Sequence, residues 1–180
     1  MNRVPDPVWN SPVDGVGLEG LSLGEQIREP TLLVFLRHFG CIFCREMVAD
    51  LHDASKSLPG FPSILYVYQG TKIDGEPFFA RHHPGASAIA DPEKRLYDAF
   101  GIKRATFMQG FGPMVWPCAV RAVRKGSGMG RPIGDPWMLP GMFLICPDRT
   151  IRWSHPFRHV GDHPDLKTIP RTLNPQSTPD

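Results

Sequence analysis

The feature that most constrains this fold is an apolar strand that runs directly into a pair of cysteines and an amphipathic helix. Residues 31–37 include five consecutive apolar side chains, which is typical of a strand covered on both faces. Gly40 then allows a turn, and from Cys44 onward apolar residues recur at helical spacing until Pro59-Gly60. The sequence therefore predicts a strand, a turn and a helix in immediate succession, with two thiols where the helix begins.

Further short elements surround this unit. The expected strands are residues 63–68, 86–90, 142–146 and 150–154, and the last two form an antiparallel hairpin. The expected helices are residues 71–83, a short helix capped by Asp91 and stopped by Gly101, and residues 115–123. Glycines at positions 126, 128 and 130 predict a long loop after the last helix. The pattern indicates an α/β fold in which helices flank a central mixed sheet that ends in the hairpin.

The length of the chain, 180 residues, fits one domain. Its 20 prolines are about twice the average share and concentrate in residues 5–12, 112–147 and 156–179, so loops should be abundant. We expect an extended N-terminal segment at 1–14, one domain at 15–168 and a mobile tail at 169–180. The first residues lack the apolar run of a secretory signal, and no stretch approaches the roughly 20 apolar residues of a membrane span. We therefore expect a cytoplasmic protein with no membrane span.

The composition excludes several classes of function. Hydrophobic residues make up 41% and charged residues 21%, as in ordinary globular proteins rather than disordered or membrane chains. The formal net charge is +2, without the strong basic excess of a nucleic-acid-binding protein. The residues closest to a basic stripe are Arg121, Arg124, Lys125 and Arg131. We interpret them as a solvated helix face followed by a loop.

The predicted chemistry is that of two thiols in the first turn of a helix. Cys41 and Cys44 lie where backbone N–H groups have no helical partner and where the helix dipole acts as a partial positive charge. Thiols in such positions have pKa values of about 3.5–7.5 instead of about 8.5, so a thiolate forms near neutral pH. Residues three apart on a helix are about 5–6 Å apart at Cβ, which allows a disulfide after a small adjustment. The pair is therefore a candidate for reversible oxidation.

Two other interpretations of the pair remain: half of a zinc site, or buried and inert cysteines. Zinc requires two more ligands, and Cys118 and Cys146 stand alone without a second C-x-x-C motif. A C-x-x-C beside a βα pattern in a cytosolic chain favours redox chemistry. Cys118 and Cys146 are interpreted as packing residues, with an extra resolving thiol at Cys118 as the alternative. No metal site is predicted.

Three histidines at positions 155, 159 and 163 have the four-residue spacing that would build a metal-binding face on a helix. Prolines at 156 and 164 and a glycine at 161 interrupt such a helix. The histidines are therefore not expected to share a metal ion.

The segment Leu33–Arg45, with the sequence LVFLRHFGCIFCR, resembles the signature of the peroxiredoxin-like branch of the AhpC/TSA antioxidant family. Further matches in the same order are Ala90–Pro92, Leu96–Tyr97, Gly134–Pro136, His155 and Asp162–Pro164. The resemblance covers residues 15–166 and implies a thioredoxin-like fold. It also implies thiol-dependent reduction of hydrogen peroxide or of organic and lipid peroxides, with electrons from a thioredoxin- or glutathione-type donor. No organic cofactor is expected.

A thioredoxin-like fold further implies a cis-proline that opens the strand facing the two thiols. Pro140 has a similar position, just before residues 142–146, and is the candidate. Because Gly141 follows it, we expect the peptide surface beside the sulfurs to be open to a bulky partner.

The resemblance leaves the roles of the two cysteines open. In a thioredoxin-like mechanism Cys41 attacks a disulfide and Cys44 resolves the mixed disulfide. The peroxiredoxin pattern Pro-x-x-x-Thr-x-x-Cys instead gives Cys44 the sulfenic acid, and here Arg37 and Cys41 replace the proline and threonine. Arg37, His38 and Arg45 are candidates for stabilising a thiolate. The alternatives to a peroxidase are a thioredoxin-like protein disulfide reductase and a non-catalytic thioredoxin-fold binding protein.

Overall fold

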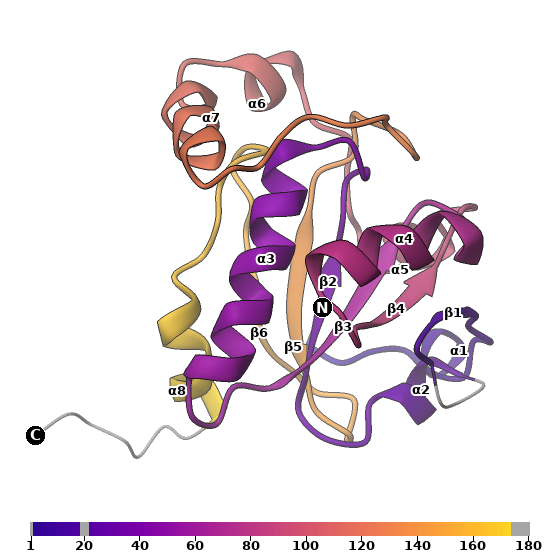
Figure 1. Ribbon diagram of the computed structural model, residues 1–180. Helices are drawn as coiled ribbons and strands as arrows, with labels where there is room; N and C mark the ends of the chain where they lie inside the picture. The colour runs from indigo at the N-terminus through magenta and orange to yellow at the C-terminus, as the bar shows by residue number, and fades with distance from the viewer. Residues whose placement is uncertain (1, 19–21, 174–180) are drawn as a thin grey trace, which may run out of the picture.

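The apolar strand predicted at residues 31–37 is the centre of the sheet (Figure 1). This strand, β2 (Thr31–Phe35), pairs in parallel with β3 (Ser63–Tyr68) on one side and antiparallel with β5 (Gly141–Ile145) on the other. All five of its side chains are buried. The computed structural model describes residues 2–18 and 22–173.

The outer strands complete a mixed sheet with the order β1-β4-β3-β2-β5-β6. β4 (Ser87–Ala90) is parallel to β3, and β1 (Gly15–Val16) pairs antiparallel with β4 at one edge. β6 (Ile151–His155) pairs antiparallel with β5 at the other edge, which confirms the predicted hairpin. The chain thus has the predicted α/β class and mixed central sheet.

The helices lie on both faces of the sheet (Figure 1). In chain order they are α1 (Asp6–Trp9), α2 (Leu23–Gln26), α3 (Ile42–Ser57), α4 (Lys72–His82), α5 (Arg95–Ala99), α6 (Phe107–Phe111), α7 (Val115–Arg124), the 3₁₀ turn η1 (Leu166–Thr168) and α8 (Ile169–Leu173). None of the helices in the described ranges is long and apolar enough to cross a membrane.

The alternation of side chains along β2 divides the core into two clusters. Leu32 and Val34 pack on one face with residues of α3 and α4, and Leu33 and Phe35 pack on the other with residues of α5 and α2. Because successive strand residues point to opposite faces, a continuous apolar run requires cover on both sides. This confirms the interpretation of the run as a strand buried on both faces.

Both ends of the chain contain more packed structure than the sequence indicated. The segment expected to be extended at 1–14 includes α1, and Val4 is buried in the core. Near the other end, Ile169 is also buried, at the start of α8. Residues 174–180 of the predicted tail lie outside the described residues.

The short helix α5 begins later than predicted, but Asp91 caps it nonetheless. The helix starts at Arg95, and the Asp91 carboxylate accepts hydrogen bonds from the backbone N–H groups of Arg95, Leu96 and Tyr97 at 2.9, 2.8 and 3.3 Å. A turn therefore separates the capping residue from the helix whose free N–H groups it satisfies.

Replacement of Asp91 by alanine should lower the free energy of unfolding by about 1–3 kcal/mol, because buried backbone donors lose their acceptor. Urea denaturation measures this change. Asp98→Ala is the matched control, since Asp98 is exposed on the same helix. An equal effect of both substitutions would contradict the capping role of Asp91.

Candidate active site

The two motif cysteines lie where β2 passes through a tight turn into α3. Cys41 is the N-cap residue of α3, its N–H donates to the His38 carbonyl at 3.1 Å, and Cys44 lies in the first turn. A Cβ atom on Gly40 would approach the Gly130 carbonyl oxygen to 2.3 Å, so the turn requires glycine at this position. The cysteine side chains are both buried, with exposures of 5% and 1%.

Arg37, the second residue after β2, makes hydrogen bonds to both sulfurs. Its backbone N–H donates to Cys44 Sγ at 3.3 Å, and its guanidinium Nη1 donates to Cys41 Sγ at 3.2 Å. The arginine side chain itself is buried among the residues of the site. One residue therefore contacts both thiols, through its backbone and through its charge.

The loop before β5 holds the guanidinium in place. Arg37 Nε donates to the Met138 carbonyl at 2.8 Å, and Nη2 donates to the Pro136 carbonyl at 2.5 Å. Gln69, which follows β3, donates from Nε2 to the Arg37 carbonyl at 2.5 Å and accepts from the Asp135 N–H at 2.9 Å. The Gly134–Pro136 motif noted in the sequence thus helps to position Arg37.

The environment shifts the pKa values of the two thiols in opposite directions. The pKa of Cys41 is lowered to about 6, chiefly by a hydrogen bond from the Cys44 thiol and also by the positive charge of Arg37, against an opposing effect of burial. Burial raises the pKa of Cys44 well above its ordinary value. At neutral pH the favoured state is therefore a Cys41 thiolate that accepts a hydrogen bond from a neutral Cys44 thiol.

His38 and Arg45 are the other candidates for stabilising a thiolate, and in the described structure neither side chain makes a hydrogen bond to a sulfur. Burial and the charges of Arg37 and Arg45 lower the pKa of His38 to about 4, so this side chain is neutral at pH 7. The Arg45 guanidinium donates to the carbonyls of Phe39 and Gly128 at 2.9 and 3.1 Å and so ties the cysteine turn to the glycine-rich loop. Of the three candidates, Arg37 is the cation that contacts a sulfur.

The prediction of a cis-proline at Pro140 is wrong, because every described peptide bond is trans. The chain before β5 is fixed in another way: the Leu139 N–H donates to the Lys103 carbonyl at 2.9 Å, and Arg37 binds the carbonyls just upstream. A Cβ atom on Gly141 would lie 2.2 Å from Ile102 Cδ1, so the Ile102 side chain packs closely on this glycine, and the open peptide surface expected beside the sulfurs stays a prediction.

A cavity of about 650 Å³ opens beside Cys41. Of the two motif cysteines, Cys41 lines it and Cys44 does not. Its wall is largely apolar and comes from α6, α7 and the glycine-rich loop, with the side chains of Phe111, Val115, Trp116, Val120 and Met129. A substrate that reaches the activated thiol therefore contacts mainly apolar groups.

The remaining cysteines lie apart from this cavity. Cys118 is on α7, where its thiol donates to the Met114 carbonyl at 3.6 Å. Cys146 is buried just after β5, at the end of the sheet where β2 begins, whereas Cys41 follows the other end of β2. The role of Cys118 as an extra resolving thiol stays a prediction, because Cys118 packs against the core cluster that contains Cys41 and Cys44.

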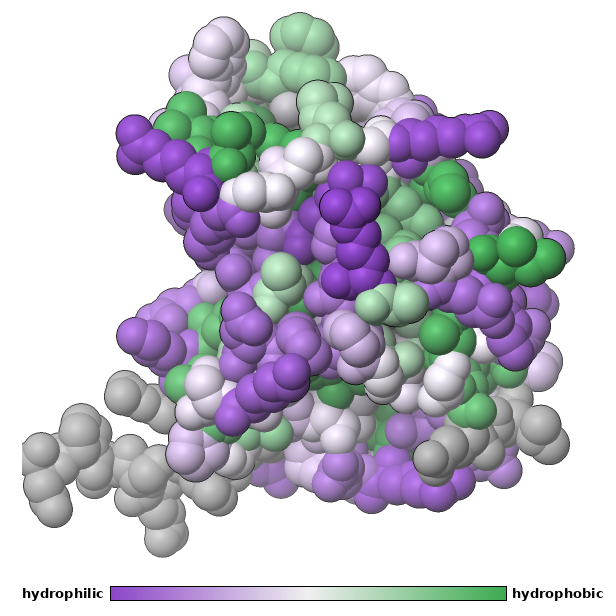
Figure 2. All heavy atoms as spheres, viewed as in Figure 1, coloured by the Kyte–Doolittle hydropathy of each residue, from purple (hydrophilic) through white to green (hydrophobic). Residues whose placement is uncertain are grey.

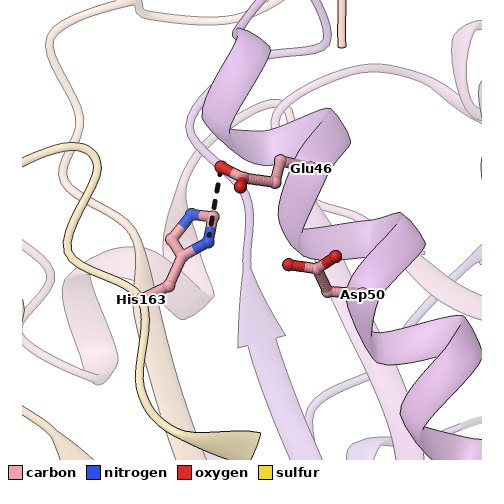
Figure 3. Close-up of side chains that lie close together, drawn as sticks. All are labelled: Glu46, Asp50 and His163. Carbon is pink, nitrogen blue, oxygen red and sulfur yellow. Dashed lines mark ion pairs between the residues drawn. The ribbon is translucent and has the colours of Figure 1, made fainter. Parts of the chain in front are cut away.

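The three histidines at 155, 159 and 163 do not form a common metal face. His155 Nε2 lies 3.5 Å from an Asp162 oxygen, whereas His163 Nδ1 lies 3.7 Å from Glu46. Figure 3 shows His163 pointing towards Glu46 and Asp50 on α3. In the described ranges Glu46, Asp50 and His163 are the one group with metal-ligand spacing.

Cations of the protein already neutralise those carboxylates. Arg121 binds Glu46 with two hydrogen bonds of 2.7 and 3.0 Å, and Lys125 binds Asp50 at 2.7 and 2.9 Å. Glu46 is fully buried, so the bidentate pair is the charge-assisted contact that satisfies it. The ion pairs attach α7 to α3 and so hold the wall of the cavity. This network was not identified from the sequence. The residue that could have indicated it is Glu46, a glutamate on the buried face of an amphipathic helix.

The comparisons with known proteins fit this arrangement. The family model described as AhpC/TSA antioxidant enzyme matches residues 49–159. The chain belongs to the AhpC/TSA antioxidant enzyme family. It is 27% identical over 159 residues to "Peroxiredoxin-like 2C" of Bos taurus, covering 81% of this chain and 69% of the relative. The Mus musculus protein of the same name is 26% identical over 162 residues, covering 83% and 71%.

Solved structures agree on the fold of this AhpC/TSA family member. A structure of Xanthomonas campestris Peroxiredoxin Q gives a TM-score of 0.68 at 15% identity, with 99% coverage of this chain and 98% of that protein. The Xanthomonas campestris bacterioferritin comigratory protein gives 0.66 at 14% identity, with 99% and 98% coverage. The fold is thus the thioredoxin fold of peroxiredoxins. The family match begins after Cys44, so it does not itself assign roles to the cysteines.

Arg37→Gln should raise the pKa of Cys41 by about 1–3, because the guanidinium that stabilises the thiolate is lost. The pH dependence of Cys41 alkylation measures this pKa: the rate should rise with pH through about 6 in the wild type and at higher pH in the variant. Arg45→Gln is the matched control. A Cys41 pKa that responds equally to both substitutions, or not to Arg37→Gln, would contradict the assigned contact.

Proposed function

We propose that this protein is a thiol peroxidase that reduces organic hydroperoxides, with Cys41 as the attacking thiol and Cys44 as the resolving thiol. The observation that carries the proposal is that the activated sulfur of the pair, Cys41, is the one that lines the apolar cavity. Membership of the AhpC/TSA family supports thiol-dependent peroxide reduction in general.

In the first step the Cys41 thiolate attacks the terminal oxygen of the hydroperoxide. The oxygen–oxygen bond breaks, Cys41 becomes a sulfenic acid, and the alkoxide leaves and takes a proton from water as the alcohol. The sulfur loses the two electrons that the peroxide gains. The Arg37 guanidinium, 3.2 Å from the sulfur, places positive charge where negative charge moves from sulfur to the leaving oxygen.

In the second step the Cys44 sulfur attacks Cys41, the sulfur–oxygen bond breaks, and water leaves with the thiol proton. Because the two thiols interact through a hydrogen bond, this step takes place between neighbouring side chains. An external dithiol of thioredoxin type, or glutathione, then supplies two electrons and two protons to restore both thiols. The raised pKa of Cys44 keeps that sulfur protonated, so it does not compete with Cys41 for the peroxide.

Two observations favour this order of roles over the reverse order of the peroxiredoxin pattern. The cavity reaches Cys41, and the lowered pKa belongs to Cys41. A thioredoxin-like disulfide reductase would use the same thiolate. The apolar cavity favours an organic peroxide over an extended peptide disulfide, and insulin reduction assays separate the two activities.

Peroxide consumption with dithiothreitol as electron donor tests the proposal. Cys41→Ser should reduce turnover of cumene hydroperoxide to the background, and Cys44→Ser should slow turnover because the internal resolving step is lost. Cys146→Ser is the matched control and should retain the wild-type rate. Full turnover by Cys41→Ser would overturn the proposal.

The cavity wall provides a second test. Val120→Asn should lower kcat/KM for cumene hydroperoxide by about 10-fold, because a polar amide replaces apolar wall, and should change the value for hydrogen peroxide much less. Val123→Asn is the control, since Val123 lies on the same helix outside the cavity. Equal losses for both peroxides would indicate that the cavity does not bind the organic group.

A further inference from the structure

The helix α7 has apolar side chains on two sides. Val115 and Ala122 are buried in the core, and Ala119 packs against it. Trp116, Val120 and Val123 are spaced so that they share one side of the helix, and their exposures are 72%, 51% and 62%. A surface helix of a globular protein ordinarily turns its apolar stripe to the core. The helix α7 follows this rule on one side and leaves a second apolar side without a partner in the described structure.

The basic residues of α7 help to fix its orientation. Arg121 is bound to Glu46, and Lys125 to Asp50, so the charged face of α7 is attached to α3. Two ion pairs, one of them to a fully buried carboxylate, thus act with the buried apolar side of α7 to hold Trp116, Val120 and Val123 away from the body of the protein.

The exposed apolar surface extends beyond α7. Further exposed side chains come from α6, the turn after it and the glycine-rich loop: Phe107, Met108, Phe111, Met114 and Met129. Together with the three residues of α7 they form what we call the α6–α7 patch. In the described ranges eight of the nine exposed large hydrophobic residues belong to this patch, and the ninth is Ile73 on α4. Figure 2 shows green side chains gathered over α6 and α7, at the end of the molecule where α3 begins.

The segment that carries the patch is purely basic. Residues 99–134 contain six lysines and arginines and no aspartate or glutamate, although the chain has 18 acidic residues in total. Lys103, Arg124 and Arg131 are exposed, and in the described part of the chain none of them lies within ion-pair distance of a carboxylate. An occupant of the patch therefore meets apolar groups on a segment whose own charged side chains are all positive.

We propose that the α6–α7 patch docks onto the surface of a lipid bilayer that carries anionic headgroups. The apolar side chains enter the boundary between headgroups and acyl chains, where tryptophan is favoured, and the three exposed cations contact the anionic lipids. A second copy of the chain is a poor occupant, because a symmetric contact would bring two purely basic segments together. An anionic bilayer satisfies both the apolar and the charged parts of the surface.

The α6–α7 patch and the cavity beside Cys41 share residues. Phe111, Trp116, Val120 and Met129 belong both to the patch and to the cavity wall. A docked protein would open the cavity beside Cys41 towards the bilayer. If the proposed peroxidase function holds, on which this step rests, hydroperoxides of membrane lipids are the substrate class that reaches the thiol from that side.

Co-sedimentation of the full chain with vesicles tests the docking without any peroxide. The protein should bind phosphatidylcholine vesicles that contain phosphatidylserine, bind pure phosphatidylcholine vesicles much more weakly, and be released by salt. The double substitution Lys103→Gln with Arg124→Gln should weaken binding about 25-fold, at about fivefold per cation. Lys56→Gln, which removes an exposed cation from the end of α3, is the control.

The apolar contribution is tested by Phe107→Ser combined with Val123→Ser. Both residues are exposed and outside the cavity wall, so thermal stability and turnover of a water-soluble hydroperoxide should be unchanged while vesicle binding is lost. Ile73→Ser, at an exposed apolar residue outside the patch, should bind as the wild type does.

Equal binding to both kinds of vesicle, or binding that neither double variant weakens, would overturn the proposal. So would a wild-type dimer that the Phe107→Ser and Val123→Ser substitutions dissociate, because the patch would then be an interface between copies. Because vesicle binding is measured without peroxide, an inactive but membrane-bound protein would refute the peroxidase and leave the docking in place.

Discussion

The contact between the buried Arg37 guanidinium and the Cys41 sulfur is the interaction on which the rest of the site depends. A buried cation is costly unless hydrogen bonds and an opposite charge satisfy it. The carbonyls of Pro136 and Met138 take two of its donor groups, and Cys41 supplies the negative charge as a thiolate. Burial of the arginine therefore favours ionisation of the cysteine, and each group stabilises the charged form of the other. Formation of a disulfide removes that thiolate, and a thiolate stabilised in the reduced state makes the corresponding disulfide easier for an external dithiol to reduce.

The thioredoxin-type sheet and the segment around α6 and α7 contribute different parts of the function. The sheet brings the ends of β2 and β3 beside the first turn of α3, where the thiols, Arg37 and Gln69 meet. The α6 and α7 segment supplies the apolar wall, and its ion pairs to Glu46 fix that wall over Cys41. In the proposed function the chemistry thus comes from the core of the fold, and the selection of substrate from a segment attached to it.

The parts of this arrangement that depend on local patterns could be predicted from the sequence. The five apolar residues of β2 and the helical spacing after Cys44 predict a strand and a helix, because burial on fixed faces requires those periods. Arg37 was one of three candidate cations, and only its contacts with residues about a hundred positions later distinguish it. The cis-proline expected at Pro140 came from the general pattern of the fold, whereas the bond before Pro140 is trans and Arg37 binds the carbonyls just upstream. The orientation of α7 was also beyond the sequence, because it depends on a pairing of helices across 75 positions.

The central claim is that Cys41 is the sulfur that meets the peroxide. The most direct measurement oxidises the Cys41→Ser and Cys44→Ser variants separately with one equivalent of cumene hydroperoxide and a dimedone-type sulfenic acid probe, then locates the adduct by mass spectrometry. The account predicts an adduct on Cys41 in the Cys44→Ser protein and little on Cys44 in the Cys41→Ser protein. An adduct that forms rapidly on Cys44, with none on Cys41, would contradict it.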